Sequence, residues 1–301
     1  MAPACARCGQ IIGATRRAVD YPTGNGAPPG GCAIVAAMNA TRPIGDLLRE
    51  WRQRRRMSQL DCAVEADISS KHLSFLETGR SRPSRDMLLK LAELLEIPLR
   101  ERNTLLVAAG FAPMFAERRL DDPTLQAARA AMELVLKGHE PYPALAIDRH
   151  WNLLAANGAV GPFLTGIGPE LLQAPMNVLR LSLHPDGLAP RIVNLAQWRT
   201  HLFARLRRQI EISADAVLIA LLEELAAYPA PEVKARSGEA DGGNLFVVPL
   251  RIATAAGVLS FISTTTVFGT PIDITLSELA LETFFPADAH TSAALRQMQQ
   301  Q

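Results

Sequence analysis

The stretch "DISSKHLSFLETGRSRPSRD", Asp67–Asp86, places a short amphipathic helix between a tight turn and a basic loop that contains proline. Leu73 and Leu76 lie on one face at helical spacing, and Gly79 is expected to end the helix. The outward positions at the front of this helix are Ser69, Ser70, Lys71 and Ser74, and the loop behind it carries Arg80, Arg82 and Arg85. This pattern favours contact with a polar, negatively charged partner.

Four more helices are predicted around this one, all with apolar residues at helical spacing. They cover residues 44–56, 59–66 and 84–95, with a fifth helix of the set after Pro98. Ser58 is the expected N-cap of the second helix, and Cys62, Ala63 and Ala66 are small enough to let helices approach closely. Two short helices joined by a turn, inside a bundle of about five, form the helix-turn-helix arrangement.

The stretch Ser58–Leu95 resembles the Xre or phage-repressor family of helix-turn-helix proteins. The resemblance is carried by Ser58, Gln59, Ala63, Ile68, Leu73, Leu76, Glu77, Gly79, Arg80 and Pro83. Asp67 stands where the family usually has Gly, and Asp tolerates the left-handed conformation better than most residues. The resemblance implies that Gln59 reaches a DNA phosphate and that Arg52 pairs with Glu77.

In this interpretation the helix at 70–78 enters the major groove of double-stranded DNA with its N-terminal residues against base edges. Ser69, Ser70, Lys71 and Ser74 are the candidate base contacts. Arg80, Arg82 and Arg85 are the candidate phosphate contacts. The alternative is a solvated polar surface, which is what most charge runs are.

The charge distribution agrees with an anionic partner for one region only. Residues 42–90 hold 11 Lys and Arg against 7 Asp and Glu, whereas residues 91–301 hold 17 against 22. The 301-residue chain is long enough for about two domains.

The chain is predicted to divide into five parts, with an α+β fold overall. These are a disordered extension (1–40), an all-α five-helix DNA-binding domain (41–115), a connector helix (116–137), an α+β domain (138–290) and a polar tail (291–301). Met38 is an alternative start of translation. Cys5 and Cys8 form one C-x-x-C with no second pair at zinc spacing, so no metal site and no cofactor are expected.

In residues 138–290 the sequence predicts a hairpin near Leu145–Ala155 leading into a helix at Gly158. Helices follow at Ile192–Ile212 and Ala214–Ala227, then two long strands around the turn Thr254–Gly257 and a final strand near Leu279–Phe284. Two strands, helices across one face and about three antiparallel strands is the order of a PAS-type sensor domain, which encloses a small cavity.

The segments "RNTLLVAAGFAPMF", "NLLAANGA", "NVLRL" and "VPLRIATAAGVLSFISTTTVFGTPIDITLSELALETFFPAD" resemble the MmyB-like regulator family. That resemblance implies a bacterial transcription regulator whose PAS-like second domain senses a small molecule, apolar or fatty-acyl. The candidate ligand contacts are Arg149, Trp151, Phe163, Trp198, Phe203 and Phe261, with Arg251, Phe284 and Phe285 as further candidates. Each aromatic residue is also an ordinary core residue in the alternative interpretation.

Enzyme motifs are missing from the sequence: there is no P-loop, G-x-S-x-G, H-E-x-x-H or G-x-G-x-x-G. The prediction is therefore a cytoplasmic, non-enzymatic regulator without a membrane span, a homodimer that binds an inverted-repeat operator. Two alternatives stay open. The C-terminal domain could serve only dimerisation or a protein partner, or it could hold a cofactor such as haem on His150, His184 or His201.

Overall fold

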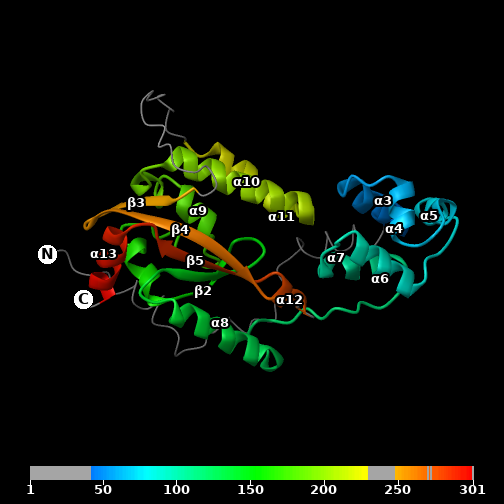
Figure 1. The fold of residues 1–301 in the computed structure, drawn as a ribbon, viewed down its shortest axis with the longest axis horizontal. Helices are drawn as coiled ribbons and strands as arrows, with labels where there is room; N and C mark the ends of the chain where they lie inside the picture. Colours follow the sequence, from blue (N-terminus) through cyan, green and yellow to red (C-terminus); the bar gives the residue numbers. More distant parts are fainter. Residues whose placement is uncertain (1–41, 230–247, 270, 272, 300–301) are drawn as a thin grey trace.

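The computed structural model describes residues 42–229, 248–269, 271 and 273–299, which form a helical region and an α+β region (Figure 1). This confirms the predicted α+β class. The predicted extension 1–40, with Cys5, Cys8 and Met38, lies outside the described residues.

The helical region contains the five predicted helices. They are α3 (Ile44–Arg54), α4 (Gln59–Glu65), α5 (Ser70–Glu77), α6 (Arg85–Leu94) and α7 (Leu99–Ala108). Serine side chains fix three of the helix starts, because Ser58, Ser69 and Ser84 each accept a hydrogen bond from the backbone N–H three residues later. The predicted N-cap at Ser58 is thereby confirmed.

Close packing of small residues sets the angle of the helix-turn-helix. Cys62, Ala63 and Ala66 are buried where α4 meets α5. A Cβ on Gly45 would lie 2.5 Å from the carbonyl oxygen of Glu77, so α3 can cross the end of α5 only with glycine there. Asp67 adopts the predicted left-handed conformation in the turn, with φ of 53°.

The connector is only partly helical, which corrects the predicted helix over 116–137. Asp122 caps a 3-10 turn, η2 (Pro123–Leu125), and α8 follows at Gln126–Gly138. Residues 116–118 are instead extended against α12 (Ile274–Ser277), where the Ile274 N–H donates to the carbonyl of Ala116. These contacts to another element explain why the helix starts late.

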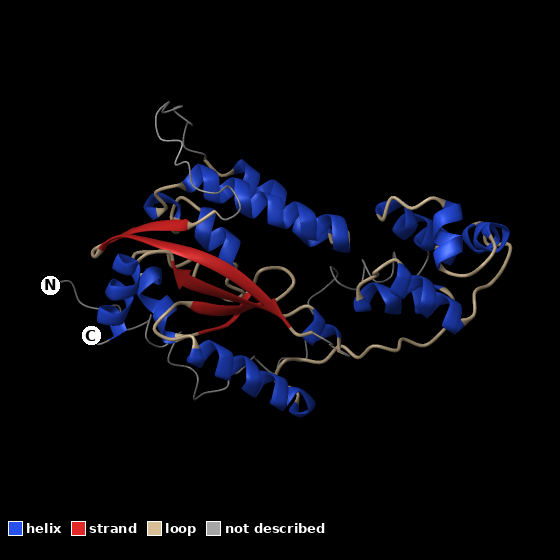
Figure 2. Cartoon of the chain, in the orientation of Figure 1, coloured by secondary structure: helices blue, strands red, loops and turns tan. Residues whose placement is uncertain are grey.

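The α+β region is built on one antiparallel sheet of five strands (Figure 2). The strands are β1 (Ala144–Ile147), β2 (Leu153–Ala156), β3 (Leu250–Thr254), β4 (Gly257–Val267) and β5 (Ala280–Pro286), in the order β2-β1-β5-β4-β3. The predicted turn Thr254–Gly257 and the predicted final strand are confirmed.

Alternation along β1 separates two layers of core. Leu145 and Ile147 face the helices α9 (Val178–Leu183), α10 (Leu195–Ser213) and α11 (Ala216–Ala227). Ala144 and Ala146 face α8 on the other side of the sheet. The segment predicted as a helix at Gly158 forms a 3-10 helix, η3 (Gly158–Leu164), and a second short one, η4, spans Ala189–Arg191.

The predicted polar tail from residue 291 is wrong, because residues Ala289–Gln299 form helix α13. Asp288 accepts a hydrogen bond from the Thr291 N–H at the start of this helix. Ala294 and Leu295 are buried in the same core as α10 and β4. A short stretch of small and polar residues is a weak helix signal, and tertiary packing stabilises it as a helix.

Candidate nucleic-acid interface and candidate ligand cavity

The front of α5 presents the polar residues that the sequence selects as base contacts. Ser69, Ser70 and Lys71 are exposed, and Ser74 is half-buried. Ser69 is also the N-cap of α5, since its hydroxyl oxygen accepts a hydrogen bond from the His72 N–H at 3.1 Å. Lys71 therefore leads a helix whose first turn is already ordered.

Phe75, which sequence reasoning missed, lies between two of the predicted cationic residues. The Lys71 ammonium is 5.7 Å and the Arg80 guanidinium 5.8 Å from the centre of its ring. The available signal was the spacing, because Lys71 and Phe75 are one helical turn apart. Cation–π contacts of this kind hold both charges on the surface formed by the front of α5.

Arg80, Arg82 and Arg85 are all exposed, and they follow α5 into the start of α6. They remain the predicted phosphate contacts. The arginines at the end of α3 have structural partners instead, since Arg55 donates to the carbonyls of Leu95 and Glu96 at the C-terminus of α6.

Gln59 is engaged inside the protein, at the start of α4. Its side-chain amide donates to the Glu77 carboxylate at 2.7 Å. An amide nitrogen carries two N–H donors, so this contact orients the side chain and leaves the predicted phosphate contact chemically available. The implied pair is confirmed: Arg52 Nε and Nη2 donate to Glu77 Oε1 and Oε2 at 2.6 and 3.0 Å.

A cavity lies inside the α+β region between the sheet and the helices α9 and α10. Its volume is about 120 Å³, and its walls are almost entirely apolar. Four of the predicted ligand contacts line it: Trp151, Phe163, Trp198 and Phe261. Phe284 also lines it, whereas Phe285 is 43% exposed.

One charged pair, also missed by sequence reasoning, faces this cavity. Arg205 of α10 donates to the Glu282 carboxylate of β5 at 2.5 and 3.2 Å, and to the hydroxyl of Thr265 at 2.8 Å. The Arg205 guanidinium also lies 4.8 Å from the centre of the Trp151 ring. Helix α10 and strand β5 are far apart in sequence, so no local sequence pattern predicts this pair.

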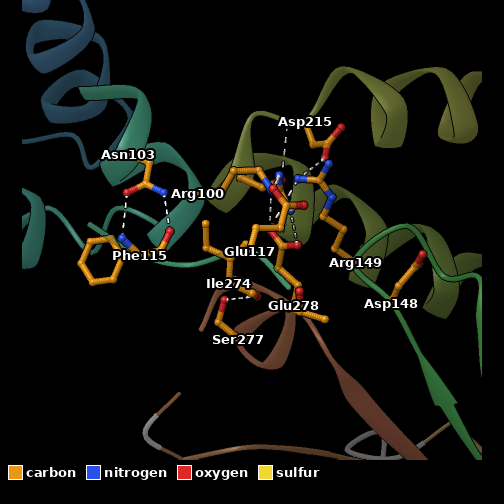
Figure 3. Close-up of polar contacts among 12 residues, drawn as sticks. Arg100, Asn103, Phe115, Glu117, Asp148, Arg149, Asp215, Ile274, Ser277 and Glu278 are labelled. Atoms are coloured by element: carbon orange, nitrogen blue, oxygen red, sulfur yellow. Dashed lines mark hydrogen bonds and ion pairs between the residues drawn. The ribbon is translucent and has the colours of Figure 1, made fainter. Parts of the chain in front are cut away.

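Two predicted ligand contacts, Phe203 and Arg149, lie away from the cavity. Phe203 follows the cavity residue Leu202 and so points about 100° around α10, where Arg199 and Arg207 stack on its ring at 5.1 and 5.8 Å. Arg149 is turned toward carboxylates: its Nη1 lies 3.4 Å from Glu278 and 3.8 Å from Asp215 (Figure 3). Arg251, the other arginine considered, is exposed on β3.

Two family models match this chain. One is described as the MmyB-like transcription regulator ligand binding domain and matches residues 128–298, which include the whole cavity. The chain belongs to the MmyB-like transcription regulator family. The second model is described as a helix-turn-helix domain and matches residues 43–105, which include α3 to α6 and most of α7.

A relative in Methanoculleus marisnigri is provisionally named as an HTH-type transcriptional regulatory protein. It is 35% identical over 134 residues, which are 43% of this chain and 40% of the relative. The helix-turn-helix domain and the MmyB-like ligand-binding domain both lie in this chain. Within residues 42–229, 248–269, 271 and 273–299 no helix is both long and apolar enough to span a membrane, and no cluster of metal-ligating side chains is found.

Proposed function

We propose that this MmyB-like regulator is a bacterial, cytoplasmic, sequence-specific DNA-binding protein whose C-terminal domain senses a small apolar or fatty-acyl ligand. The observation that carries the proposal is the combination of an exposed cationic helix front at α5 with an apolar cavity in the second domain. No catalytic role is assigned to the chain.

The DNA-binding part of the proposal rests on geometry and charge. Helix α5 is short, capped and braced from behind by the buried Arg52–Glu77 pair, while Lys71 and Arg80 flank its outer face. A rigid helix with cations at its front can enter the major groove, and the arginines after it can neutralise phosphates.

The ligand-sensing part rests on the cavity lining. Aromatic and aliphatic side chains would surround an acyl chain, and the Arg205–Glu282 pair would offer hydrogen bonds to one polar end. This arrangement suits an amphiphilic molecule better than a strongly charged one. The PAS-type likeness of the domain supports the same conclusion by analogy of fold.

The competing function gives the C-terminal domain only a role in dimerisation or protein binding. It draws support from exposed apolar residues on α11, where Val217 is 54% and Ile219 is 42% exposed. A homodimer on an inverted repeat is compatible with both functions.

Two measurements on the full-length protein test the proposal. Selection from a pool of random DNA duplexes should enrich one inverted-repeat sequence. Mass spectrometry of molecules extracted from the purified protein should find an apolar or acyl compound in near-stoichiometric amount. Enrichment of no sequence would overturn the DNA-binding part. An empty extract, together with no heat of binding to hexadecanoate, would leave the competing function.

A further inference from the structure

The junction between the two domains is polar and anchored at a few points. Asn103 of α7 holds the linker, since its Oδ1 accepts from the Phe115 N–H at 3.0 Å and its Nδ2 donates to the Phe115 carbonyl at 2.7 Å. The linker is held in turn by the C-terminal domain, because Arg118 donates to the buried Asp273 at 2.7 Å. The linker is thus fastened on both sides, and Figure 3 shows the contact between Asn103 and Phe115.

Arg100 connects α7 directly to the C-terminal domain. Its guanidinium donates to both oxygens of Glu278 at 2.8 and 3.0 Å, and to both oxygens of Glu117 at 2.7 and 2.5 Å. A cavity of about 240 Å³, lined by residues of both domains, lies beside this contact. Among the described residues no cluster of buried apolar side chains spans the two domains, so the Arg100–Glu278 contact carries much of the anchorage.

Glu278 is shared with Arg149, which lies in the turn between β1 and β2. The Arg149 side chain reaches Glu278 at 3.4 Å, and its backbone carbonyl accepts from Gln209 Nε2 at 2.7 Å. Gln209 Oε1 in turn accepts from the Trp151 indole N–H at 2.8 Å. One side chain on α10 therefore holds both the residue that contacts Glu278 and a wall of the ligand cavity.

Trp151 is positioned to respond to what enters the cavity. Its indole lines the cavity beside Arg205, and its backbone has φ of 67°, a left-handed conformation that is strained for a bulky residue. A strained residue held by one side-chain hydrogen bond can be moved by a ligand pressing on its ring. A ligand acts on an equilibrium only by contacting the two arrangements differently, and Trp151 offers such a contact.

We propose that Gln209 couples the ligand cavity to the DNA-binding domain. A ligand that displaces the Trp151 indole breaks the Trp151–Gln209 hydrogen bond and frees the Arg149 backbone that Gln209 holds. The Arg149 side chain then shifts away from Glu278, which disturbs the Arg149–Glu278–Arg100 network at the junction. This inference rests on the proposed function, because it gives the regulatory step of the same cavity.

Hydrogen exchange of the full-length protein tests the coupling first without any ligand. The reporter is the backbone amide of Ile274 in α12, which donates to the carbonyl of Ala116 in the linker. Gln209→Leu should speed its exchange by roughly threefold or more. Trp151→Phe, which keeps an aromatic ring but loses the indole N–H donor, should do the same. Arg100→Met gives the size of the effect when the Arg100–Glu278 contact is lost.

The matched control is Gln197→Leu, the same change at an exposed position of the same helix. It should leave the Ile274 amide unchanged. If the Ile274 amide exchanges at the wild-type rate in Gln209→Leu and Trp151→Phe but faster in Arg100→Met, the proposed coupling is wrong. Using two variants guards against one of them failing to fold.

A ligand arm separates this inference from the proposed function. Hexadecanoate that binds the wild-type protein should speed exchange at Ile274, and should add nothing in Gln209→Leu. Binding without faster exchange in the wild type would overturn the coupling but leave ligand sensing intact. If hexadecanoate does not bind, the acyl ligand class fails, and the exchange rates of the ligand-free variants still decide the coupling.

Discussion

Glu77 is the centre of a buried network of polar side chains in the DNA-binding domain. Its carboxylate is fully buried and is contacted by Arg52, Gln59 and, at 3.5 Å, Arg49. Burial alone would raise the pKa of this carboxyl, but the hydrogen bonds from Arg52 and Gln59 hold its pKa below the usual value. The charge is therefore stable only as long as its partners remain.

Glu77→Gln should destabilise the helix-turn-helix domain by about 3–5 kcal/mol, because it leaves the Arg52 guanidinium buried without a counter-charge. Urea denaturation followed by circular dichroism measures the change. Glu50→Gln is the control, since Glu50 pairs with Arg54 on the surface and should cost no more than about 1 kcal/mol. Equal effects from the two variants would show that burial of the Glu77 pair does not set its strength.

Lys71 and Arg82 should differ in what they contribute to DNA binding. Lys71→Ala should weaken operator binding by about 1–3 kcal/mol and relax specificity at one base position. Arg82→Ala should weaken all sequences alike and reduce the salt dependence by about one phosphate contact. Binding isotherms at several salt concentrations separate the two effects. The control is Arg208→Ala, at an exposed arginine on α10. Wild-type affinity in both test variants would show that α5 is not the recognition helix.

At the scale of elements, Asp215 links the start of α11 to the β1–β2 turn. Its carboxylate caps α11 by accepting from the Val217 N–H at 2.8 Å, and it accepts from His150 Nε2 at 2.9 Å. Burial alone would raise the pKa of this carboxyl, but the His150 hydrogen bond, the cap and the Arg149 charge lower it from 3.8 to about 2.

Because the folded-state pKa of Asp215 lies below the unfolded value, its ionised form stabilises the fold above about pH 4. That contribution, roughly 2 kcal/mol, is lost as the pH falls from about 4 to about 2. The Asp215→Asn variant should therefore be less stable at neutral pH. Its free energy of unfolding should also change less with pH over this acid range, as measured by urea denaturation at a series of pH values. Asp186→Asn, at an exposed carboxylate, should follow the wild-type curve; the same slope in Asp215→Asn would refute the assignment.

The elements that sequence could predict are those with local signals. Ser58, Ser69 and Ser84 mark helix starts by their own hydrogen bonds, so the five N-terminal helices follow from sequence. Helix α13 depends instead on tertiary packing of Ala294 and Leu295 into the core that β4 and α10 share. The cavity shows the same division. Its aromatic walls could be selected by residue type, whereas the Arg205–Glu282 pair and the outward turn of Phe203 depend on the exact placement of α10 over β5.

At the scale of the whole molecule, the two domains lie side by side with α7 facing α12 (Figure 1), and the described chain holds one helix-turn-helix. One such unit reads about half a site, so tight binding to an inverted repeat calls for two chains. Exposed apolar residues that could form the interface lie on α8, where Leu134 is 74% exposed, and on α11, where Val217 is 54% exposed. The DNA-binding domain offers a rival surface on α4, with Leu60 and Val64 at 62% and 69% exposed.

We predict a homodimer formed through residues beyond 115, because an interface on α4 would lie in the domain that must meet DNA. Sedimentation velocity of the full-length protein at micromolar concentration should show a dimer. One of the variants Leu134→Glu and Val217→Glu, the one on the surface that forms the interface, should convert it to a monomer, since a charge buried in an apolar interface is strongly unfavourable. Leu60→Glu is the matched variant on the rival surface and should leave the dimer intact. A wild-type monomer would contradict the prediction outright, and a dimer lost only in Leu60→Glu would move the interface to the DNA-binding domain.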